Sequence, residues 1–282
     1  MHIARTVREA RDFARALPRP LAFVPTMGAL HAGHLKLIEA ARVDGAAALA
    51  VSIFVNPLQF GPTEDFARYP RAFPEDCAAL EAAGVDLLFA PGVEEMYSSS
   101  FVAGVDPGPL GNVFEGAIRP GHFHGVATVC TKLFSIVGAE CVYFGEKDAQ
   151  QVAVLRRVIA DLNLPVDLIV VPTVREADGL ALSSRNVYLT PEERAAAPSL
   201  YLALREIAQA VQNGARERGI IAHAQRCIRA PLREAYLDVV DPTSFAPLME
   251  LRTPSIVIGS VYAGAVRLID NIPLIAAAER AA

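Results

Sequence analysis

Paired cysteines, long apolar runs and an excess of basic residues are all missing from this chain of 282 residues. Its cysteines (Cys77, Cys130, Cys141 and Cys227) are widely spaced and form no C-x-x-C pair, which argues against a disulfide scaffold or a structural zinc site. No uninterrupted apolar run approaches the roughly 20 residues that a membrane-spanning helix needs. Lysine and arginine number 26 against 31 aspartates and glutamates, which disfavours nucleic acid as a partner. These absences favour a cytoplasmic protein with reduced thiols.

Three familiar sequence motifs are missing as well. The stretch Gly116–Gly121 has the spacing of a P-loop, but His122 follows where a P-loop requires lysine. The patterns G-x-G-x-x-G and G-x-S-x-G do not occur anywhere in the chain. P-loop hydrolysis, dinucleotide redox chemistry and serine hydrolysis are therefore disfavoured.

Short apolar runs alternate with helical patterns over the first two thirds of the chain. The predicted strands are Leu21–Thr26, Ala47–Phe54, Val85–Ala90, Cys141–Phe144 and Val166–Val171, and the predicted helices are Leu35–Val43, Glu75–Ala83 and Ala149–Leu162. Because these strands are apolar throughout, we expect burial on both faces, as in a parallel sheet covered by helices. The expected fold is α/β, with a Rossmann-like doubly wound sheet whose ligands bind beyond the carboxyl ends of the strands.

The N-terminal segment Met1–Pro20 is rich in arginine but also contains Glu9 and Asp12. Its apolar residues, from Ile3 to Leu17, recur at helical spacing, and the segment runs directly into the first predicted strand. We therefore predict a packed helix here and not a removable targeting segment.

The sequence pattern changes after about Val174. Thr190 and Pro191 are typical of a helix start, with threonine as the N-cap and proline at the first helical position. Predicted helices near Glu192–Gln212 and Ala215–Ala230 are followed by predicted antiparallel strands at Ala235–Val240 and Ser255–Ile269, the last one interrupted at Gly259 and Gly264. The chain is thus expected to form two domains, residues 1–174 with the parallel sheet and residues 175–282 as a smaller α+β domain.

The segment Pro25–His34, with the sequence PTMGALHAGH, lies between the first predicted strand and a predicted helix. A helix N-terminus offers free N–H groups and the positive end of the helix dipole, which together attract phosphate. His31 and His34 share one face of the first helical turn, and Gly33 lets a ligand approach the backbone closely. A single histidine here would more often be a cap or a packed residue, but the pair in this context predicts a site for the phosphates of a nucleotide.

This segment resembles the H-x-G-H signature of the nucleotidylyltransferase and class I aminoacyl-tRNA synthetase superfamily. Further segments resemble the pantoate–β-alanine ligase (pantothenate synthetase) family and occur in the order found there. They are Phe54–Gly61 (FVNPLQFG), Arg119–Phe123 (RPGHF), Tyr143–Asp148 (YFGEKD), Val171–Glu176 (VPTVRE) and Leu182–Asn186 (LSSRN). The resemblance covers residues 25 to about 190 and is weaker in the C-terminal third.

The resemblance implies a ligase that joins pantoate to β-alanine in two steps. The pantoate carboxylate attacks the α-phosphorus of ATP and releases pyrophosphate, and the amine of β-alanine then displaces AMP from the pantoyl-adenylate. Such chemistry requires fixed positive donors and Mg²⁺ but no covalent nucleophile from the protein. The resemblance also implies a homodimer in the cytoplasm, with an ATP- and pantoate-binding first domain and a second domain that acts as a lid.

The same resemblance assigns roles to individual residues. The catalytic residues it implies are His34 (the proton donor), His31, Lys147 and Arg185, and the ATP-binding residues are Met27, Gly28, His31, His34, Gly145, Glu146, Lys147, Asp148, Val174, Leu182, Ser183, Ser184 and Arg185. Gln59 and Gln151 would bind pantoate, and Gln59 also β-alanine. The neighbouring Gln150 could point the same way, so only the resemblance selects Gln151. Asp148 is the candidate Mg²⁺ ligand, although it could simply begin the following helix.

Two residues depart from the family pattern, and the second of them leaves an alternative open. Leu182 stands where many relatives have methionine, and His124 creates a second close histidine pair with His122. A zinc hydrolase that uses the pairs His31/His34 and His122/His124 is therefore an alternative. A nucleotidylyltransferase that keeps AMP in its product and a nucleotide sensor without turnover are two others. The segment rich in proline and glycine, Gly104–Gly125, is expected to be a mobile cover of the site.

Overall fold

The computed structural model describes residues 1–62, 64 and 66–274. Its contacts divide the chain into two compact units, the first formed by Met1–Gly145 with Gln150–Pro172 and the second by Glu146–Ala149 with the chain from Thr173 onward. The domain boundary after residue 174 stays a prediction, and the last eight residues of the second predicted domain lie outside the described part. The segment Glu146–Ala149, which we expected in the first domain, groups with the second unit.

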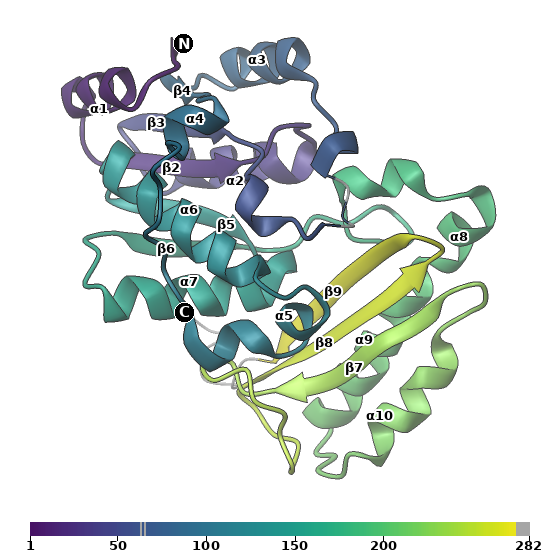
Figure 1. The fold of residues 1–282 in the computed structure, drawn as a ribbon. Helices are drawn as coiled ribbons and strands as arrows, with labels where there is room; N and C mark the ends of the chain where they lie inside the picture. Colours follow the sequence, from purple (N-terminus) through teal and green to yellow (C-terminus); the bar gives the residue numbers. More distant parts are fainter. Residues whose placement is uncertain (63, 65, 275–282) are drawn as a thin grey trace. The chain divides into compact units, whose positions relative to one another are not determined.

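The first unit is built on a parallel sheet of six strands (Figure 1). Its elements are β1 (His2–Ala4), α1 (Val7–Ala16), β2 (Leu21–Thr26), α2 (Ala32–Val43), β3 (Ala48–Ile53), η1 (Pro57–Gln59), η2 (Phe66–Arg68), α3 (Phe73–Ala82), β4 (Leu87–Phe89), α4 (Val93–Met96), η3 (Gly108–Asn112), α5 (Glu115–Ile118), α6 (His122–Val137), β5 (Cys141–Gly145), α7 (Ala149–Asp161) and β6 (Asp167–Val171). The strand order is β1-β4-β3-β2-β5-β6. From β2 the chain winds outward through β3 to β4, and β5 then pairs on the other side of β2, so the topological switch point lies between β2 and β5.

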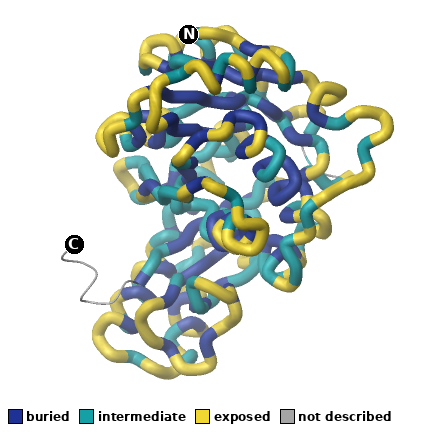
Figure 2. The backbone as a smooth tube through the Cα atoms, turned by 90° about the vertical axis from the view of Figure 1, so that its left-hand side faces the viewer, coloured by how far each residue is buried: buried dark blue, intermediate teal, exposed yellow. Residues whose placement is uncertain are grey.

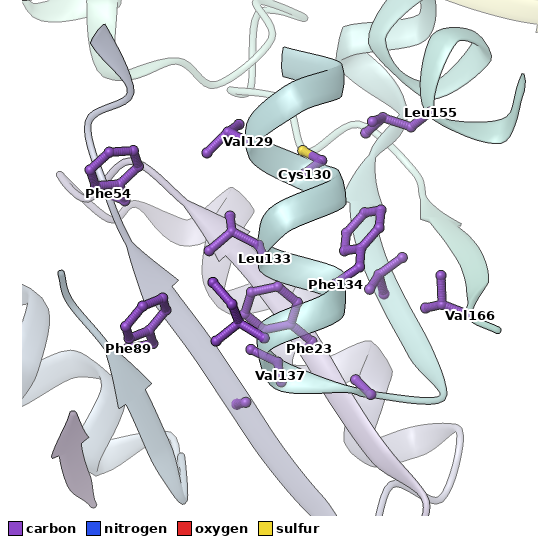
Figure 3. Close-up of a cluster of buried hydrophobic side chains, with 14 of the residues drawn as sticks. Phe23, Phe54, Phe89, Val129, Cys130, Leu133, Phe134, Val137, Leu155 and Val166 are labelled. Carbon is purple, nitrogen blue, oxygen red and sulfur yellow. The ribbon is translucent and has the colours of Figure 1, made fainter. Parts of the chain in front are cut away.

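Alternating residues of the strands enter two separate cores, one on each face of the sheet. In β2, Leu21 and Phe23 pack on the face covered by α1, α6 and α7, whereas Ala22 and Val24 pack on the face covered by α2 and α3. Figure 3 shows Leu133 of α6 beside Phe23 in the first of these cores. The four central strands β2, β3, β4 and β5 are largely buried, whereas the edge strands β1 and β6 are mostly exposed or half-buried, and the remaining exposed residues lie mainly in outer helices and loops (Figure 2). The doubly wound parallel sheet is thereby confirmed.

One expectation for the first unit is wrong in detail, and one long helix was not predicted. The segment His2–Ala4 is a strand that pairs in parallel with β4, and helix α1 begins only at Val7, because Thr6 and Glu9 form a capping box there. The long helix α6 was not predicted, and its first turn takes up the end of the segment expected to be a mobile cover. Within that segment, η3 and α5 are also regular, so much of it is helical; its mobility stays a prediction.

The second unit contains a small antiparallel sheet packed against helices, as the α+β expectation required. Its elements are η4 (Glu146–Asp148), η5 (Ser184–Tyr188), α8 (Pro191–Ala196), α9 (Pro198–Gln212), α10 (Gly219–Ala224), η6 (Gln225–Cys227), β7 (Arg233–Val240), β8 (Ser255–Ala263) and β9 (Val266–Leu274). The strand order is β7-β8-β9. Side chains of α9 and of the three strands form the core of this unit.

Three predicted elements of the second unit need correction. The helix expected at Glu192–Gln212 is two helices, because Pro198 has no N–H to continue the first one. The helix expected at Ala215–Ala230 is regular only over the six residues of α10 and the short η6. Gly259 does not interrupt its strand, since it lies within β8, where a Cβ would come 2.9 Å from the Leu200 side chain. Gly264, with φ at 56°, forms the turn between β8 and β9.

Helix α6 packs closely against η1 at Gly125, so a substitution at this glycine tests the contact. A Cβ at this position would lie 2.3 Å from the Leu58 carbonyl oxygen and 2.6 Å from the Gln59 nitrogen, and backbone atoms cannot rotate away. We expect Gly125→Ala to lower the free energy of unfolding by about 1–3 kcal/mol, measured by urea denaturation. The control is Gly92→Ala, where a Cβ meets nothing within 4 Å. It should change stability by less than about 0.5 kcal/mol, and equal losses in the two variants would contradict the packing described here.

Candidate active site

The residues singled out in the first unit follow the carboxyl ends of neighbouring strands. Met27 and Gly28 come directly after β2, and Gln59 ends η1, which follows β3. The Gln59 side chain is buried, and its Nε2 lies 3.3 Å from the Met27 sulfur. The structure thus brings the predicted ATP-binding Met27 and the predicted pantoate-binding Gln59 into contact.

His31 and His34 form a capping box at the start of helix α2, and their rings lie next to each other. The His31 Nδ1 accepts a hydrogen bond from the Gly33 N–H at 3.1 Å, and the His34 Nδ1 accepts one from the His31 N–H at 3.3 Å. The two ring centroids are 4.1 Å apart. Because both Nδ1 atoms are acceptors, each neutral ring carries its proton on Nε2. The capping role and the functional role are therefore compatible, since Nδ1 serves the helix and Nε2–H is the donor.

Gly33 has a local reason to be glycine. A Cβ at this position would lie 2.8 to 2.9 Å from atoms of the His31 ring, so the absence of a side chain makes room for the imidazole that caps the helix. The expected close approach to the Gly33 backbone is thus made by the protein's own His31, and approach by a ligand stays a prediction.

Asp76 of α3 holds the loop that precedes His31. This carboxylate is 3% exposed and accepts hydrogen bonds from the Ala29 N–H at 2.9 Å and the Leu30 N–H at 2.7 Å. The loop needs such support because Gly28 and Ala29 both have positive φ angles, 82° and 51°. Sequence reasoning missed Asp76, and its position on an ordinary helical face offered no signal for this role.

Asn56 and Tyr97 fix the orientation of the Gln59 carboxamide. The Asn56 Nδ2 donates to the Gln59 Oε1 at 2.9 Å and to the Gly125 carbonyl at 3.1 Å. The Tyr97 hydroxyl donates in turn to the Asn56 Oδ1 at 2.8 Å, and burial raises the pKa of this tyrosine well above its usual range. Gln59 therefore uses its oxygen on the protein and directs its Nε2 donors elsewhere. Asn56 lies in one of the segments quoted above, but nothing in the sequence pointed to Tyr97.

An ion pair holds the backbone of Gln59 from the other side. Arg119 donates to both carboxylate oxygens of Glu64, at 2.6 and 2.8 Å, and to the Gln59 carbonyl at 3.2 Å. The Arg119 Nη1 lies 2.9 Å from the His122 Nε2, which must accept because guanidinium can only donate. The His122 Nδ1–H then donates to the Gln59 carbonyl at 2.8 Å. His122 therefore has a structural role here, whereas His124 is exposed and lies beside Gly104.

Gln150 and Gln151 are distinguished by their contacts. The Gln150 Oε1 accepts from the Glu115 N–H, and its Nε2 donates to the carbonyls of Leu110 and Val113. Both polar atoms of the Gln150 amide are therefore used in hydrogen bonds to the segment before α6. Gln151, in the same turn of α7, is half-buried and is the amide we retain for pantoate binding.

The second unit brings together two of the predicted ATP-binding segments. The Glu146 carboxyl accepts a hydrogen bond from the Thr173 backbone, and burial raises the pKa of this glutamate. The Asn271 Nδ2 of β9 donates to the carbonyls of Glu146 and Lys147. Further along, the Ser183 hydroxyl oxygen accepts from the Arg185 N–H and so caps η5.

The remaining predicted residues are distributed between the units. The second unit also holds Asp148, Val174, Leu182 and Ser184, and the first holds Gly145 at the end of β5. His34 belongs to the first unit, and Lys147 and Arg185 to the second, so their convergence on one ligand stays a prediction.

In the first unit, a cavity of about 240 Å³ opens beside the loop that follows β2 and begins with Met27 and Gly28. Its lining includes Met27, Phe54, Arg71, Phe73 and Asp76, so its walls are mainly apolar with one cation and one buried carboxylate. Among residues 1–62, 64 and 66–274, no three His, Cys, Asp or Glu side chains are grouped so that they could hold a metal ion. The zinc-hydrolase alternative thus finds no ligand set in the described part of the chain. No helix in that part is long and apolar enough to span a bilayer.

Comparisons with known proteins agree over nearly the whole chain. A family model described as pantoate–β-alanine ligase matches residues 2–273. A pantothenate synthetase from Chloroflexus aggregans is 52% identical over 275 residues, covering 96% of this chain and 99% of that protein. A crystal structure of the enzyme of that name from Thermus thermophilus has a TM-score of 0.92 at 49% identity and covers 98% of this chain and 100% of that chain. Another, of a pantoate–β-alanine ligase from Francisella tularensis complexed with β,γ-ATP and β-alanine, has a TM-score of 0.80 at 33% identity, with 97% of each chain covered.

The ion pair of Glu64 with Arg119 predicts a specific response to acid. Burial alone would raise the pKa of Glu64, but the hydrogen bonds and charge of Arg119 outweigh it and lower the pKa from 4.5 to about 2. A carboxyl whose pKa is lower in the folded chain stabilises the fold above the unfolded value and loses that contribution as the pH falls toward the folded one. We therefore expect the unfolding free energy to decline less between about pH 5 and pH 2 in Glu64→Gln than in the wild type.

Chemical denaturation at a series of pH values measures this difference. The matched control is Glu39→Gln, because Glu39 pairs with Lys36 on the surface and its side chain is 59% exposed. Its decline should parallel that of the wild type. A Glu64→Gln variant that loses stability in acid as steeply as the wild type would show that this ion pair does not stabilise the fold.

Proposed function

The chain belongs to the pantoate–β-alanine ligase family, and on that premise we propose that it condenses (R)-pantoate with β-alanine through a pantoyl-adenylate. ATP would be cleaved to AMP and pyrophosphate, and pantothenate, a precursor of coenzyme A, would be the product. Family membership makes the chain a ligase. The observation that carries the finer proposal is the pair of imidazoles at the N-terminus of α2, where both rings keep their Nε2 protons at the switch point of the sheet.

The first half-reaction requires positive charge where negative charge develops. When the pantoate carboxylate attacks the α-phosphorus of ATP, charge grows on the α-phosphate and on the departing pyrophosphate. The Nε2–H groups of His31 and His34 would donate to these oxygens, beside the positive end of the α2 dipole. The His34 Nε2–H would donate a hydrogen bond to the departing pyrophosphate and keep its proton, because Nδ1 is occupied by the His31 N–H and cannot take up another. Lys147 and Arg185 of the second unit would add an ammonium and a guanidinium.

The remaining ATP contacts would come from segments of both units. Met27, Gly28 and Gly145 would contact the nucleotide from the first unit. Residues of the second unit would complete the site: Glu146, Val174, Leu182, Ser183 and Ser184. The hydroxyls of the serines would close over the phosphates together with Arg185, and the second domain would act as a lid that excludes water from the adenylate.

Pantoate would be held by the amides of Gln59 and Gln151. Because Asn56 donates to the Gln59 Oε1, the orientation of the amide is fixed, and its Nε2–H donors suit the carboxylate and hydroxyl oxygens of pantoate. A neutral amide does this without a second charge that would have to be desolvated. The β-alanine amine would then attack the acyl carbon of the adenylate, with Gln59 also in contact with β-alanine.

Asp148 is suited to hold Mg²⁺. It is a half-buried carboxylate on η4, directly after Lys147, and Mg²⁺ typically binds one or two carboxylates together with substrate phosphates. When bound, the ion would neutralise part of the triphosphate charge. The residues of this chain would orient the substrates.

We also propose that the protein acts in the cytoplasm as a homodimer. All four cysteines are free thiols, as expected in a reducing compartment, and the proposed substrate ATP is a cytoplasmic metabolite. The dimer is proposed from the family resemblance alone. Sedimentation at several protein concentrations would measure the mass directly.

Product analysis tests the proposed function. We expect AMP, pyrophosphate and pantothenate in equal amounts when the protein is incubated with ATP, Mg²⁺, pantoate and β-alanine. ADP as the nucleotide product would contradict the adenylate route. AMP retained in the final product would favour the nucleotidylyltransferase alternative, and ATP binding without turnover would favour the sensor.

Two single substitutions test the charge model. His34→Ala and Lys147→Ala should each reduce the rate by about 10²–10³-fold, because each removes a donor to charge that develops in the transition state. Pantoate-dependent exchange of pyrophosphate into ATP measures this step alone, and thermal unfolding checks that both variants fold. A rate near that of the wild type would refute the role of the residue concerned. The surface variant Lys36→Ala, which only breaks the exposed pair with Glu39, should keep full activity.

A further inference from the structure

Asn271 of β9 is a buried polar residue to which the proposed reaction gives no role. It is 2% exposed, and its Nδ2 donates to the Glu146 carbonyl at 2.8 Å and to the Lys147 carbonyl at 2.9 Å. The two N–H groups of one side-chain amide thus donate to the carbonyls of two successive residues of η4. The contact joins residues that are more than 120 positions apart in the sequence.

The surroundings of Asn271 hold it rigidly. Its backbone N–H donates to the Asp270 Oδ1 at 2.8 Å, and its carbonyl accepts from the Arg175 Nη2 at 3.3 Å. Arg175 also donates to both oxygens of Asp270, at 2.5 and 2.9 Å, and its guanidinium lies 3.8 Å from the centre of the Tyr201 ring. Asp270 and Arg175 therefore fix the strand position from which the Asn271 amide reaches η4.

The hydrogen-bonding groups of the Asn271 amide indicate its role. Asparagine is the shortest side chain that offers two N–H donors on one atom, and both are used on η4. Its Oδ1 is buried and finds no hydrogen-bond partner among the described residues. A buried acceptor without a partner is unfavourable, so the side chain is accounted for by its donors and not by its oxygen.

We propose that Asn271 is a positioning residue for Lys147. By holding the carbonyls on both sides of the Lys147 nitrogen and Cα, it fixes two peptide planes and hence the direction in which the lysine side chain leaves the backbone. The ammonium can stabilise developing charge only from a defined place, and displacements of about 1 Å can cost about 10²-fold in rate. The inference rests on the role of Lys147 in the proposed function.

The same strand also holds a second predicted ATP-binding position of this unit, Val174. Arg175 directly follows Val174, and its ion pair with Asp270 ties that segment to the residue before Asn271. Two segments that are separate in sequence are therefore aligned by one dipeptide, Asp270-Asn271. This also gives a physical reason why Glu146–Ala149 groups with the second unit.

Two isosteric substitutions test the proposal. Asn271→Leu removes both donors, and Asn271→Asp replaces the donor nitrogen by a single oxygen that faces the two carbonyls. We expect either variant to lower the rate of pantoate-dependent ATP–pyrophosphate exchange by about 10- to 100-fold. The KM for pantoate should stay within about twofold, because Lys147 acts on phosphate charge and not on pantoate. Wild-type exchange rates in both folded variants would overturn the proposal.

Ser260→Ala is the matched control for loss of stability. Ser260 is fully buried in β8 of the same sheet, and it makes none of the contacts with η4 described above. Its thermal unfolding temperature reports the effect of a buried polar deletion in this sheet. We expect its exchange rate to remain that of the wild type. A fall in rate as large as that of Asn271→Leu would mean that general destabilisation explains both variants, which would overturn the proposal.

A double-mutant cycle with Lys147→Ala separates positioning from a merely structural role. If Asn271 acts through Lys147, adding Asn271→Leu to Lys147→Ala should lower the rate further by less than about twofold. Losses that multiply would show that Asn271 acts elsewhere. A large loss in Lys147→Ala with none in Asn271→Leu would refute this inference and leave the proposed function intact. Full activity in Lys147→Ala would refute both.

Discussion

One buried carboxylate, which binds two backbone N–H groups, holds the loop on which the position of His31 and His34 depends. Gly28 and Ala29 must both adopt left-handed backbone angles between β2 and α2, a conformation that costs energy for alanine. Asp76, which lies on the neighbouring helix α3, compensates by accepting hydrogen bonds from the N–H groups of Ala29 and Leu30. Only with this loop in place does α2 begin at the point where His31 caps it and His34 lies beside His31. The arrangement of the two histidines is thus set by a residue that lies more than 40 positions further along the chain.

Gln59 illustrates the same principle with hydrogen bonds from two directions. Asn56 takes its side-chain oxygen, while Arg119 and His122 donate to its backbone carbonyl. Gly125 lets α6 approach closely enough for these contacts to form. The amide that we propose for pantoate binding is therefore surrounded by groups that fix its orientation.

Much of the first unit could be predicted because its strands obey simple rules. Leu21–Thr26 is apolar on both faces, and the structure reproduces this strand to the residue. The strand His2–Ala4 was missed because three residues carry too little pattern, although the capping-box spacing of Thr6 and Glu9 could have marked where the helix begins. Helix α6 was missed because the glycines and prolines before it favoured a loop.

The site was predictable to a different extent. His31 and His34 were singled out from their position between a strand and a helix, whereas Gln59 came from the family resemblance, and the roles of all three stay predictions. The residues that hold these segments and η4 could not be predicted, since Asp76, Tyr97 and Asn271 make their contacts with residues 41 or more positions away and carry no motif of their own. Long-range hydrogen bonds of this kind become visible only when the chain has folded.

The allocation of Glu146–Ala149 to the second unit has a mechanical consequence. The chain passes from one unit to the other after Gly145, after Ala149 and after Pro172, so three peptide bonds join the units. A protease cut at any one of these junctions would leave the units still joined by main chain at the other two. A displacement of the second unit would therefore act, through the main chain itself, on the last residue of β5 and the first turn of α7.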